Sequence, residues 1–234
     1  INLPLARDLL AATLAIAADP GARVVLLDGA GKLFCAGGDL KGFAGRDDLP
    51  AHLREILAAL HAAITNLVRG DAPVVAAVQG SAAGAGMGLV GASDLVVAAE
   101  SAKFVMAYTG VGLAPDGSSS WFLPRLVGLR RALELTLTNR VLSATEALDW
   151  GLITQVVPDD ELADSAGALA AKLASGAAPA LARAKRLLHT SLEETLETHL
   201  AREADAISTA SATPQGIEGV AAFVEKRAPV FNPD

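Results

Sequence analysis

Residues 74–94 decide the fold, and they read VVAAVQGSAAGAGMGLVGASD. The apolar run at residues 73–78 predicts a buried strand, and the Gln-Gly pair that follows it predicts a turn. The small residues beyond predict a helix over residues 84–92, and a further strand is expected over residues 94–98. Because the first turn of this helix carries almost no side chains, a ligand atom can approach its free backbone N–H groups closely.

A second glycine turn lies upstream, in residues 34–41, which read FCAGGDLK. The two glycines allow the backbone to turn and to be approached closely. If Gly38 opens a helical turn, its N–H has no partner within the helix. Two such small-residue turns in one α/β core suit an oxyanion hole, in which fixed donors hold a negative carbonyl oxygen.

The remaining pattern divides the chain into two regions. In the first half, a helix is predicted at residues 3–18 and another at 50–68, with extended segments at 24–27 and 33–36. In the second half, helices are predicted at residues 129–138, 144–150, 160–174, 180–208 and 214–226, with one strand at 153–157. We predict an α/β core at residues 1–122 that carries the oxyanion hole, and a helical C-terminal region at residues 123–234.

Composition excludes several classes of function. The formal net charge is −7 and no basic block stands out, which argues against nucleic-acid binding. Residues 72–93 carry no charge but contain five glycines, so they favour a strand, a turn and a helix over a membrane span. The single cysteine, Cys35, allows no disulfide within the chain and favours a cytoplasmic protein. The glycine spacing does not fit the G-x-G-x-x-G pattern of dinucleotide-binding folds.

The motifs at residues 34–41 and 74–94 and the run AFVEKR at residues 222–227 resemble the enoyl-CoA hydratase/isomerase (crotonase) family, over nearly the whole chain. The resemblance implies an α/β, crotonase-like (ClpP/crotonase) spiral of ββα units with a C-terminal helical region. Asn2-Leu3 falls where the family has Asn-Ala-Leu near its first helix, so the two strands before that helix are expected to be absent from this chain.

The family also implies a substrate and partners. The substrate would be a coenzyme A thioester, with no other cofactor and no metal, and the chain would form a homotrimer or a hexamer built as a dimer of trimers. Gly38 and Ala85 would supply the oxyanion-hole N–H groups. The remaining residues expected to contact coenzyme A are Ala36, Asp39, Leu40, Lys41, Gly84, Phe223 and Lys226, the last two at its nucleotide end and possibly across a subunit boundary.

The sequence departs from the hydratases of the family at both of their catalytic glutamates. Those positions fall here on Gly88 and Tyr108. Because adding water requires a general acid and a general base within reach of that water, simple hydration is not expected.

Asp116 lies where several relatives have a catalytic aspartate, among them dienoyl-CoA isomerases, the ring-oxepin isomerases of phenylacetate breakdown and 4-chlorobenzoyl-CoA dehalogenases. In the isomerases this residue moves a proton between carbons, and in the dehalogenase it attacks the ring. The competing interpretation is an N-cap for a helix that begins near Ser118.

His61 matches the spacing of the dehalogenase's active-site histidine, and Tyr108 falls where that enzyme has a tryptophan. The competing interpretation of His61 is a packed or surface side chain on an apolar helix. His189 and His199 are expected to lie on polar helix faces, in solvent.

The sequence thus favours an isomerase in which Gly38 and Ala85 polarise the thioester, Asp116 relays a proton, and His61 and Tyr108 complete the active site around the acyl group. A hydrolytic dehalogenase, with Asp116 as nucleophile and His61 activating water, remains open. So does an acyl-CoA binder without catalysis.

Overall fold

The computed structural model describes residues 1–232, and in these residues a four-stranded parallel sheet forms the centre of the fold. Its order is β1 (Val25–Leu27), β2 (Val74–Val78), β4 (Leu95–Ala99) and β7 (Gln155–Val157). Every residue of β2 is buried, as expected for a central parallel strand covered on both faces. The strands predicted at residues 73–78, 94–98 and 153–157 are confirmed.

A smaller sheet runs beside the first and contains β3 (Ser81–Ala83), β5 (Lys103–Val105) and β6 (Leu142–Ser143). The chain alternates between the sheets: β2 leads to β3 and then α4 (Ala85–Ala92), and β4 leads to β5 and later α5 (Ser119–Val127). This is the expected spiral of ββα units. The sequence did not predict β3 and β5, because β3 is made of small residues that resemble a turn.

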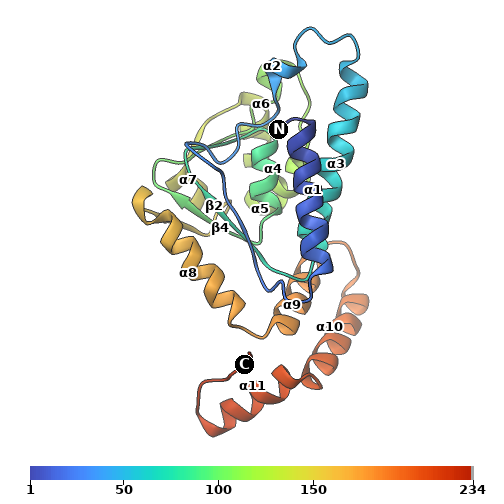
Figure 1. Ribbon diagram of the computed structural model, residues 1–234, viewed down its shortest axis with the longest axis vertical. Coiled ribbons are helices and arrows are strands. Elements are labelled where there is room, and N and C mark those ends of the chain that lie inside the picture. The colour runs from blue at the N-terminus through green and yellow to red at the C-terminus, as the bar shows by residue number, and fades with distance from the viewer. Residues whose placement is uncertain (233–234) are drawn as a thin grey trace.

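Helices α1 (Leu3–Ala18) and α3 (Leu49–Arg69) lie side by side along one side of the sheet (Figure 1). The side chain of Asn2 caps α1 by accepting the N–H of Leu5 at 3.1 Å, which fixes where that helix begins. Between α1 and α3 the chain forms β1 and the short α2 (Leu40–Phe43). Both long helices were predicted.

The C-terminal helices are α6 (Leu129–Thr138), α7 (Ala144–Asp149), α8 (Leu162–Ala174), α9 (Ala178–Thr190), α10 (Leu196–Ser211) and α11 (Pro214–Glu225). The single helix predicted at residues 180–208 is wrong, because the chain breaks at residues 191–195 and Thr195 caps α10. Helices α10 and α11 project from the core as an arm (Figure 1). No residue of α10 is buried.

The two regions share one core. The boundary predicted at residues 122 and 123 falls inside α5, and β7 from the second region pairs with β4 in the main sheet. Short 3₁₀ turns at Thr109–Val111 and Asp159–Glu161 complete the described secondary structure. Within residues 1–232, no helix combines the length and the apolar character needed to cross a membrane.

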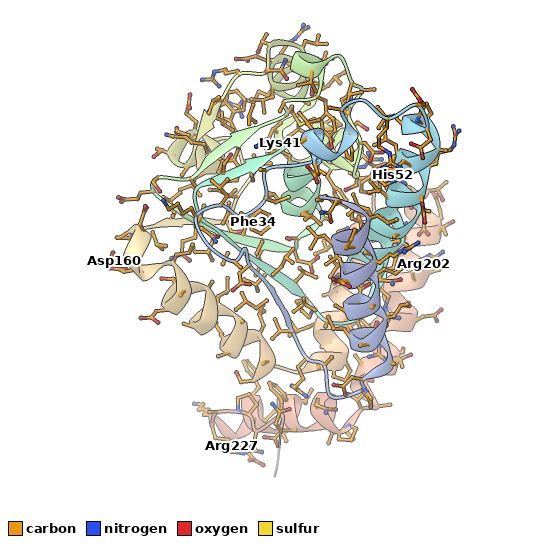
Figure 2. All side chains as sticks on the ribbon, turned by 45° about the horizontal axis from the view of Figure 1, so that its top comes forward. Phe34, Lys41, His52, Asp160, Arg202 and Arg227 are labelled. Carbon is orange, nitrogen blue, oxygen red and sulfur yellow. The ribbon has the colours of Figure 1, made fainter. Side chains whose placement is uncertain are left out.

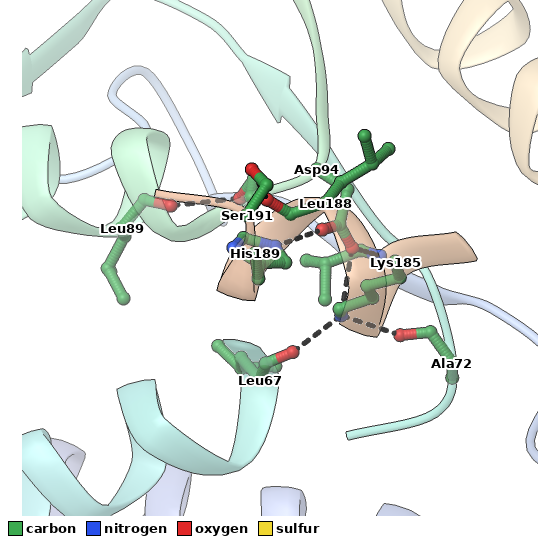
Figure 3. A network of polar contacts seen from close by, with 10 residues as sticks. Leu67, Ala72, Leu89, Asp94, Lys185, Leu188, His189 and Ser191 are labelled. Carbon is green, nitrogen blue, oxygen red and sulfur yellow. Dashed lines mark hydrogen bonds and ion pairs between the residues drawn. The ribbon is translucent and has the colours of Figure 1, made fainter. Parts of the chain in front are cut away.

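A buried polar network joins α9 to the core (Figure 3). Lys185 Nζ donates to the carbonyl oxygens of Leu67 and Ala72 at 2.7 and 3.0 Å and pairs with Asp94 at 2.8 Å. His189 Nε2 lies 3.0 Å from the other oxygen of Asp94. The prediction that His189 and His199 are solvated is wrong, because their side chains are only 21% and 15% exposed.

Asp94 is ionised within this network. Burial alone raises the pKa of its carboxyl group, but hydrogen bonds and charge from His189 and Lys185 outweigh burial and hold the pKa below its usual 3.8. Asp94 comes after Ser93, the C-cap of α4, so the network lies at the C-terminal end of the helix that begins at Ala85.

Candidate active site

A cavity of about 390 Å³ opens between α3, the N-terminus of α4 and the loop after β5. Its walls are largely apolar and come from α2, α3 and the loop at residues 107–116. The larger aliphatic and aromatic side chains that line it are those of Ile1, Leu40, Phe43, Leu53, Ile56, Leu57, Leu60, Tyr108, Val111 and Leu113. Such walls suit an apolar acyl group with few polar contacts.

Gly38 and Ala85 both line this cavity. Ala85 is the first residue of α4, so its N–H has no acceptor within the helix. Among the residues that the structure describes, no acceptor takes the N–H of either Gly38 or Ala85. Gly38 and Ala85 therefore border one cavity, and within the described residues their N–H groups are not used in hydrogen bonds.

The backbone geometry that brings the donors together depends on glycine. Gly37 has a φ of +89°, and a Cβ there would lie 2.9 Å from the carbonyl oxygen of Ala83. The segment that carries Gly38 is thus pressed against β3. The expectation that Gly38 opens a helical turn is wrong in detail, because α2 begins at Leu40 and Asp39 is its N-cap.

Asp116 also lines this cavity, and its carboxyl group meets the half-exposed side chain of His61. His61 Nε2 lies 3.0 Å from Oδ1 and 3.3 Å from Oδ2, as expected when Nε2–H donates to a carboxylate. The alternative of an N-cap is not supported, since Ser118 occupies the N-cap of α5. Helix α3 and the loop before α5 thus bring together the two side chains that the sequence singled out.

Gly88 explains why no carboxylate stands at the first hydratase position. A Cβ on Gly88 would lie 1.7 Å from the carbonyl oxygen of Gly117. The loop that carries Asp116 therefore occupies the space that a side chain at residue 88 would need. The path of this loop therefore accounts both for the absence of a glutamate at residue 88 and for the position of Asp116.

Tyr108, at the second hydratase position, lines the cavity and holds the same loop. Its hydroxyl donates to the backbone oxygen of Asp116 at 3.0 Å. Burial, and then the neighbouring charge of Asp116, raise the pKa of the Tyr108 phenol, so the hydroxyl stays protonated as a donor at neutral pH.

The residues expected to contact coenzyme A divide into three groups. Ala36, Leu40 and Gly84 line the cavity. Asp39 instead caps α2 by accepting the N–H of Gly42 at 3.1 Å, and Lys41 is exposed on α2 (Figure 2).

Phe223 and Lys226 do not come near the cavity within one chain. They lie at the end of α11, across the molecule from α2 (Figure 1), and the neighbouring Arg227 is likewise far from Lys41 (Figure 2). The ring of Phe223 is 85% exposed. Among residues 1–232 the structure shows no group of three or more His, Cys, Asp or Glu side chains that could hold a metal ion.

The sequence missed one contribution to the site. Ser119 is the first residue of α5, and its hydroxyl donates to the backbone oxygen of Asp116 at 2.8 Å. Only the path of the loop reveals this contact.

Comparison with known proteins agrees with this geometry. The model of the enoyl-CoA hydratase/isomerase family matches residues 1–234. The chain belongs to this family. Its spiral of ββα units is the crotonase fold, and the protein is a crotonase-family enzyme that acts on acyl-CoA.

Relatives within the enoyl-CoA hydratase/isomerase family carry different activities in their names. The 1,2-epoxyphenylacetyl-CoA isomerase of Escherichia coli (strain K12) is 41% identical over 218 residues, covering 91% of this chain and 82% of the isomerase. The 4-chlorobenzoyl coenzyme A dehalogenase-1 of Arthrobacter sp is 34% identical over 210 residues, covering 89% of this chain and 76% of the dehalogenase. The crystal structure of the enoyl-CoA hydratase from Bacillus anthracis matches with a TM-score of 0.93 at 35% identity, covering 100% of this chain and 90% of that one.

Proposed function

We propose that the protein is an acyl-CoA isomerase that shifts a double bond or rearranges a ring next to the thioester. The N–H groups of Gly38 and Ala85 hold the thioester oxygen as negative charge develops on it, which makes the α-carbon more acidic. Asp116 accepts a proton from one carbon and returns it to another. The observation that carries the proposal is that Asp116 lines the same cavity as Gly38 and Ala85.

The number of acid–base groups favours isomerisation over hydration. Isomerisation leaves the composition of the substrate unchanged, so one carboxylate can both take and return the proton. Hydration needs groups that activate a water and protonate a carbon. Among the described residues that line the cavity, Asp116 alone carries a carboxylate, and the loop excludes a second one at Gly88. The relay needs no cofactor beyond the coenzyme A of the substrate.

Asp116→Asn tests the proposal. Because general acid–base catalysis typically contributes about 10²- to 10⁴-fold, we expect kcat for isomerisation to fall at least about 100-fold. Binding of the CoA ester, measured by titration, should be retained, since the oxyanion donors remain. Asp160→Asn, at a surface position far from the cavity (Figure 2), is the control. Unchanged turnover in Asp116→Asn would rule out the proton relay.

The substrates to assay follow from the cavity and from one relative. Apolar walls favour enoyl-CoA esters and arylacetyl-CoA derivatives, and a ring epoxide of the kind named for the Escherichia coli isomerase is the first choice. Ligand binding by a wild-type protein that turns over none of these esters would favour the non-catalytic acyl-CoA binder.

A second candidate is a hydrolytic dehalogenase, favoured by the contact of 3.0 Å between His61 and Asp116. In that reaction Asp116 displaces chloride from an aryl ring, and His61 activates the water that cleaves the resulting ester. Chloride release from 4-chlorobenzoyl-CoA distinguishes the two. If wild type releases chloride over many turnovers and His61→Gln releases no more than about one chloride per enzyme, because the aryl ester is then not cleaved, the dehalogenase replaces the isomerase.

We further propose that copies of the chain assemble as a trimer, or as a dimer of trimers, through the C-terminal arm. Large apolar side chains on α10 and α11 are exposed, and monomers rarely leave such a surface uncovered. They are Leu196, Leu200, Ile207, Ile217, Val220, Phe223 and Val224. Since Phe223 and Lys226 lie far from the cavity of their own chain, they would contact coenzyme A bound to a neighbouring copy.

A further inference from the structure

The backbone oxygen of Asp116 receives hydrogen bonds from two side chains. The Tyr108 hydroxyl donates to it at 3.0 Å and the Ser119 hydroxyl at 2.8 Å. The N–H of Ser119 adds a longer contact of 3.3 Å. A carbonyl oxygen has two lone pairs, so these donors occupy its hydrogen-bonding capacity fully.

Packing fixes the other side of the same loop. Gly117 has a φ of +61° and Ser118 one of +69°, so the chain reverses sharply after Asp116 through a conformation that serine seldom adopts. The reversal presses Gly117 against Gly88, and an added Cβ on Gly117 would lie 3.5 Å from the Cβ of Ala85. The backbone of Asp116 is therefore placed relative to the helix that supplies an oxyanion donor.

We propose that Ser119 and Tyr108 are positioning residues that hold Asp116 over the two oxyanion donors. Ser119 is only 2% exposed and is the first residue of α5, whose N-cap is the preceding Ser118. Its hydroxyl points back to Asp116. The two side chains come from opposite ends of the active-site loop, so together they tie both ends to one atom.

Catalysis depends on this placement more than substrate binding does. A carboxylate displaced by a fraction of an ångström transfers a proton poorly, while the oxyanion donors and the apolar walls still bind the ester. Loss of positioning should therefore lower kcat and leave KM unchanged. Substitution of a residue with a merely structural role would lower thermal stability, but it would not lower kcat while leaving KM unchanged.

The experiment compares Tyr108→Phe, Ser119→Ala and the double variant, with Ser120→Ala as the matched control at an exposed position of the same helix. A buried hydrogen bond of ordinary strength corresponds to roughly 3- to 10-fold in rate, so each single variant should lose about that much kcat. The double variant should lose more than the product of the two, because either donor alone still holds the oxygen. Ser119→Thr, which keeps the hydroxyl, should restore the rate.

Two outcomes would overturn the inference. One is a double variant whose kcat stays within about twofold of wild type, and the other is a rise in KM with kcat unchanged. Tyr108→Phe preserves the ring, so it gives a result even if substitutions at the buried Ser119 fail to fold.

A structural measurement keeps this inference separate from the proposed function on which it rests. In a crystal structure of the double variant, the separation of 3.0 Å between His61 Nε2 and Asp116 Oδ1 should lengthen. If it does while the wild type isomerises no ester, the isomerase proposal fails and the positioning role stands. If the separation is unchanged, the positioning role is wrong whatever the reaction.

Discussion

At the scale of single residues, the chemistry depends on where the chain lacks side chains. The two proposed oxyanion donors are backbone N–H groups, so the proposed role tolerates alanine as well as glycine at residue 85. Gly88 has the opposite role, since its missing side chain admits the loop of Asp116. One residue thus excludes a hydratase carboxylate and permits the carboxylate that replaces it.

Gly88→Ala should lower both stability and activity. Its methyl group would meet the carbonyl oxygen of Gly117, and overpacking of this kind typically costs about 1–3 kcal/mol. Urea unfolding measures the loss. The matched control is Gly167→Ala in α8, where nothing lies within 4 Å and alanine should stabilise the helix by about 1 kcal/mol. Equal stability changes in the two variants would contradict the loop contact.

At the scale of elements, the Asp94 network joins α3, β2, β4 and α9 (Figure 3). Asp94 also accepts the N–H of Val74 at 2.7 Å, so its two carboxylate oxygens accept hydrogen bonds from donors on several elements. This network holds one end of α4, and the oxyanion donor lies at the other. The position of the donor therefore depends on contacts remote from the cavity.

Lys185→Met should be strongly destabilising. Removing one partner of a buried pair leaves an uncompensated charge, which typically costs about 3–5 kcal/mol, and Lys185 is only 4% exposed. Arg186→Met is the matched control on the same helix, because its partner Asp71 is 3.6 Å away and 70% exposed. That exposed pair should contribute about 0–1 kcal/mol. Chemical denaturation measures the loss of unfolding free energy in both variants. Similar losses in the two would contradict the buried network.

The contribution of Asp94 should depend on pH. Its pKa is lowered in the folded protein, so the stabilisation is present above the unfolded value and is lost as pH falls through the folded one. The difference in unfolding free energy between wild type and Asp94→Asn should be largest near neutral pH and shrink as pH falls below 3.8. Asp71→Asn, at an exposed position, is the control. A difference that stays constant with pH would show that Asp94 is not ionised in the network.

The sequence predicted the elements with strong periodicity and missed those defined by contacts. The apolar run of β2 and the amphipathic pattern of α3 specify a strand and a helix locally. In contrast, β3 consists of small residues that become a strand only by pairing with β5. The break between α9 and α10 was missed because residues on both sides favour helix.

The candidate site shows the same division between features specified by the local sequence and features defined by contacts. The two glycine-rich turns are visible in the sequence, and both Gly38 and Ala85 line the cavity, but their role as donors stays a prediction. The meeting of His61 and Asp116 was suggested only by resemblance, and the fold alone brings α3 against the loop before α5. Ser119 could not be found from the sequence, since its role depends on a reversal of the backbone at the two residues before it.

At the scale of the whole molecule, the arm of α10 and α11 stands apart from the core and exposes apolar side chains (Figure 1). Phe223 is 85% exposed and Val224 is 73% exposed. A surface of this kind at the end of the molecule remote from the cavity is suited to cover another copy rather than its own chain.

Phe223→Asp should dissociate the assembly. A charge placed in an apolar interface remains unpaired and buried, which disfavours association. Light scattering should give the mass of several chains for wild type and a lower mass for the variant, together with weaker CoA-ester binding. Leu14→Asp, at an exposed position of α1, is the control. A wild-type protein with the mass of one chain would contradict the proposed assembly.

The most direct test of the central claim is hydrogen–deuterium exchange at the α-carbon of an arylacetyl-CoA ester in D₂O. This exchange requires the oxyanion donors and the Asp116 base but no knowledge of the natural acyl group. We expect the wild type to catalyse it, and Asp116→Asn to lose it while still binding the ester. Equal exchange in the two proteins, or none in the wild type, would contradict the account.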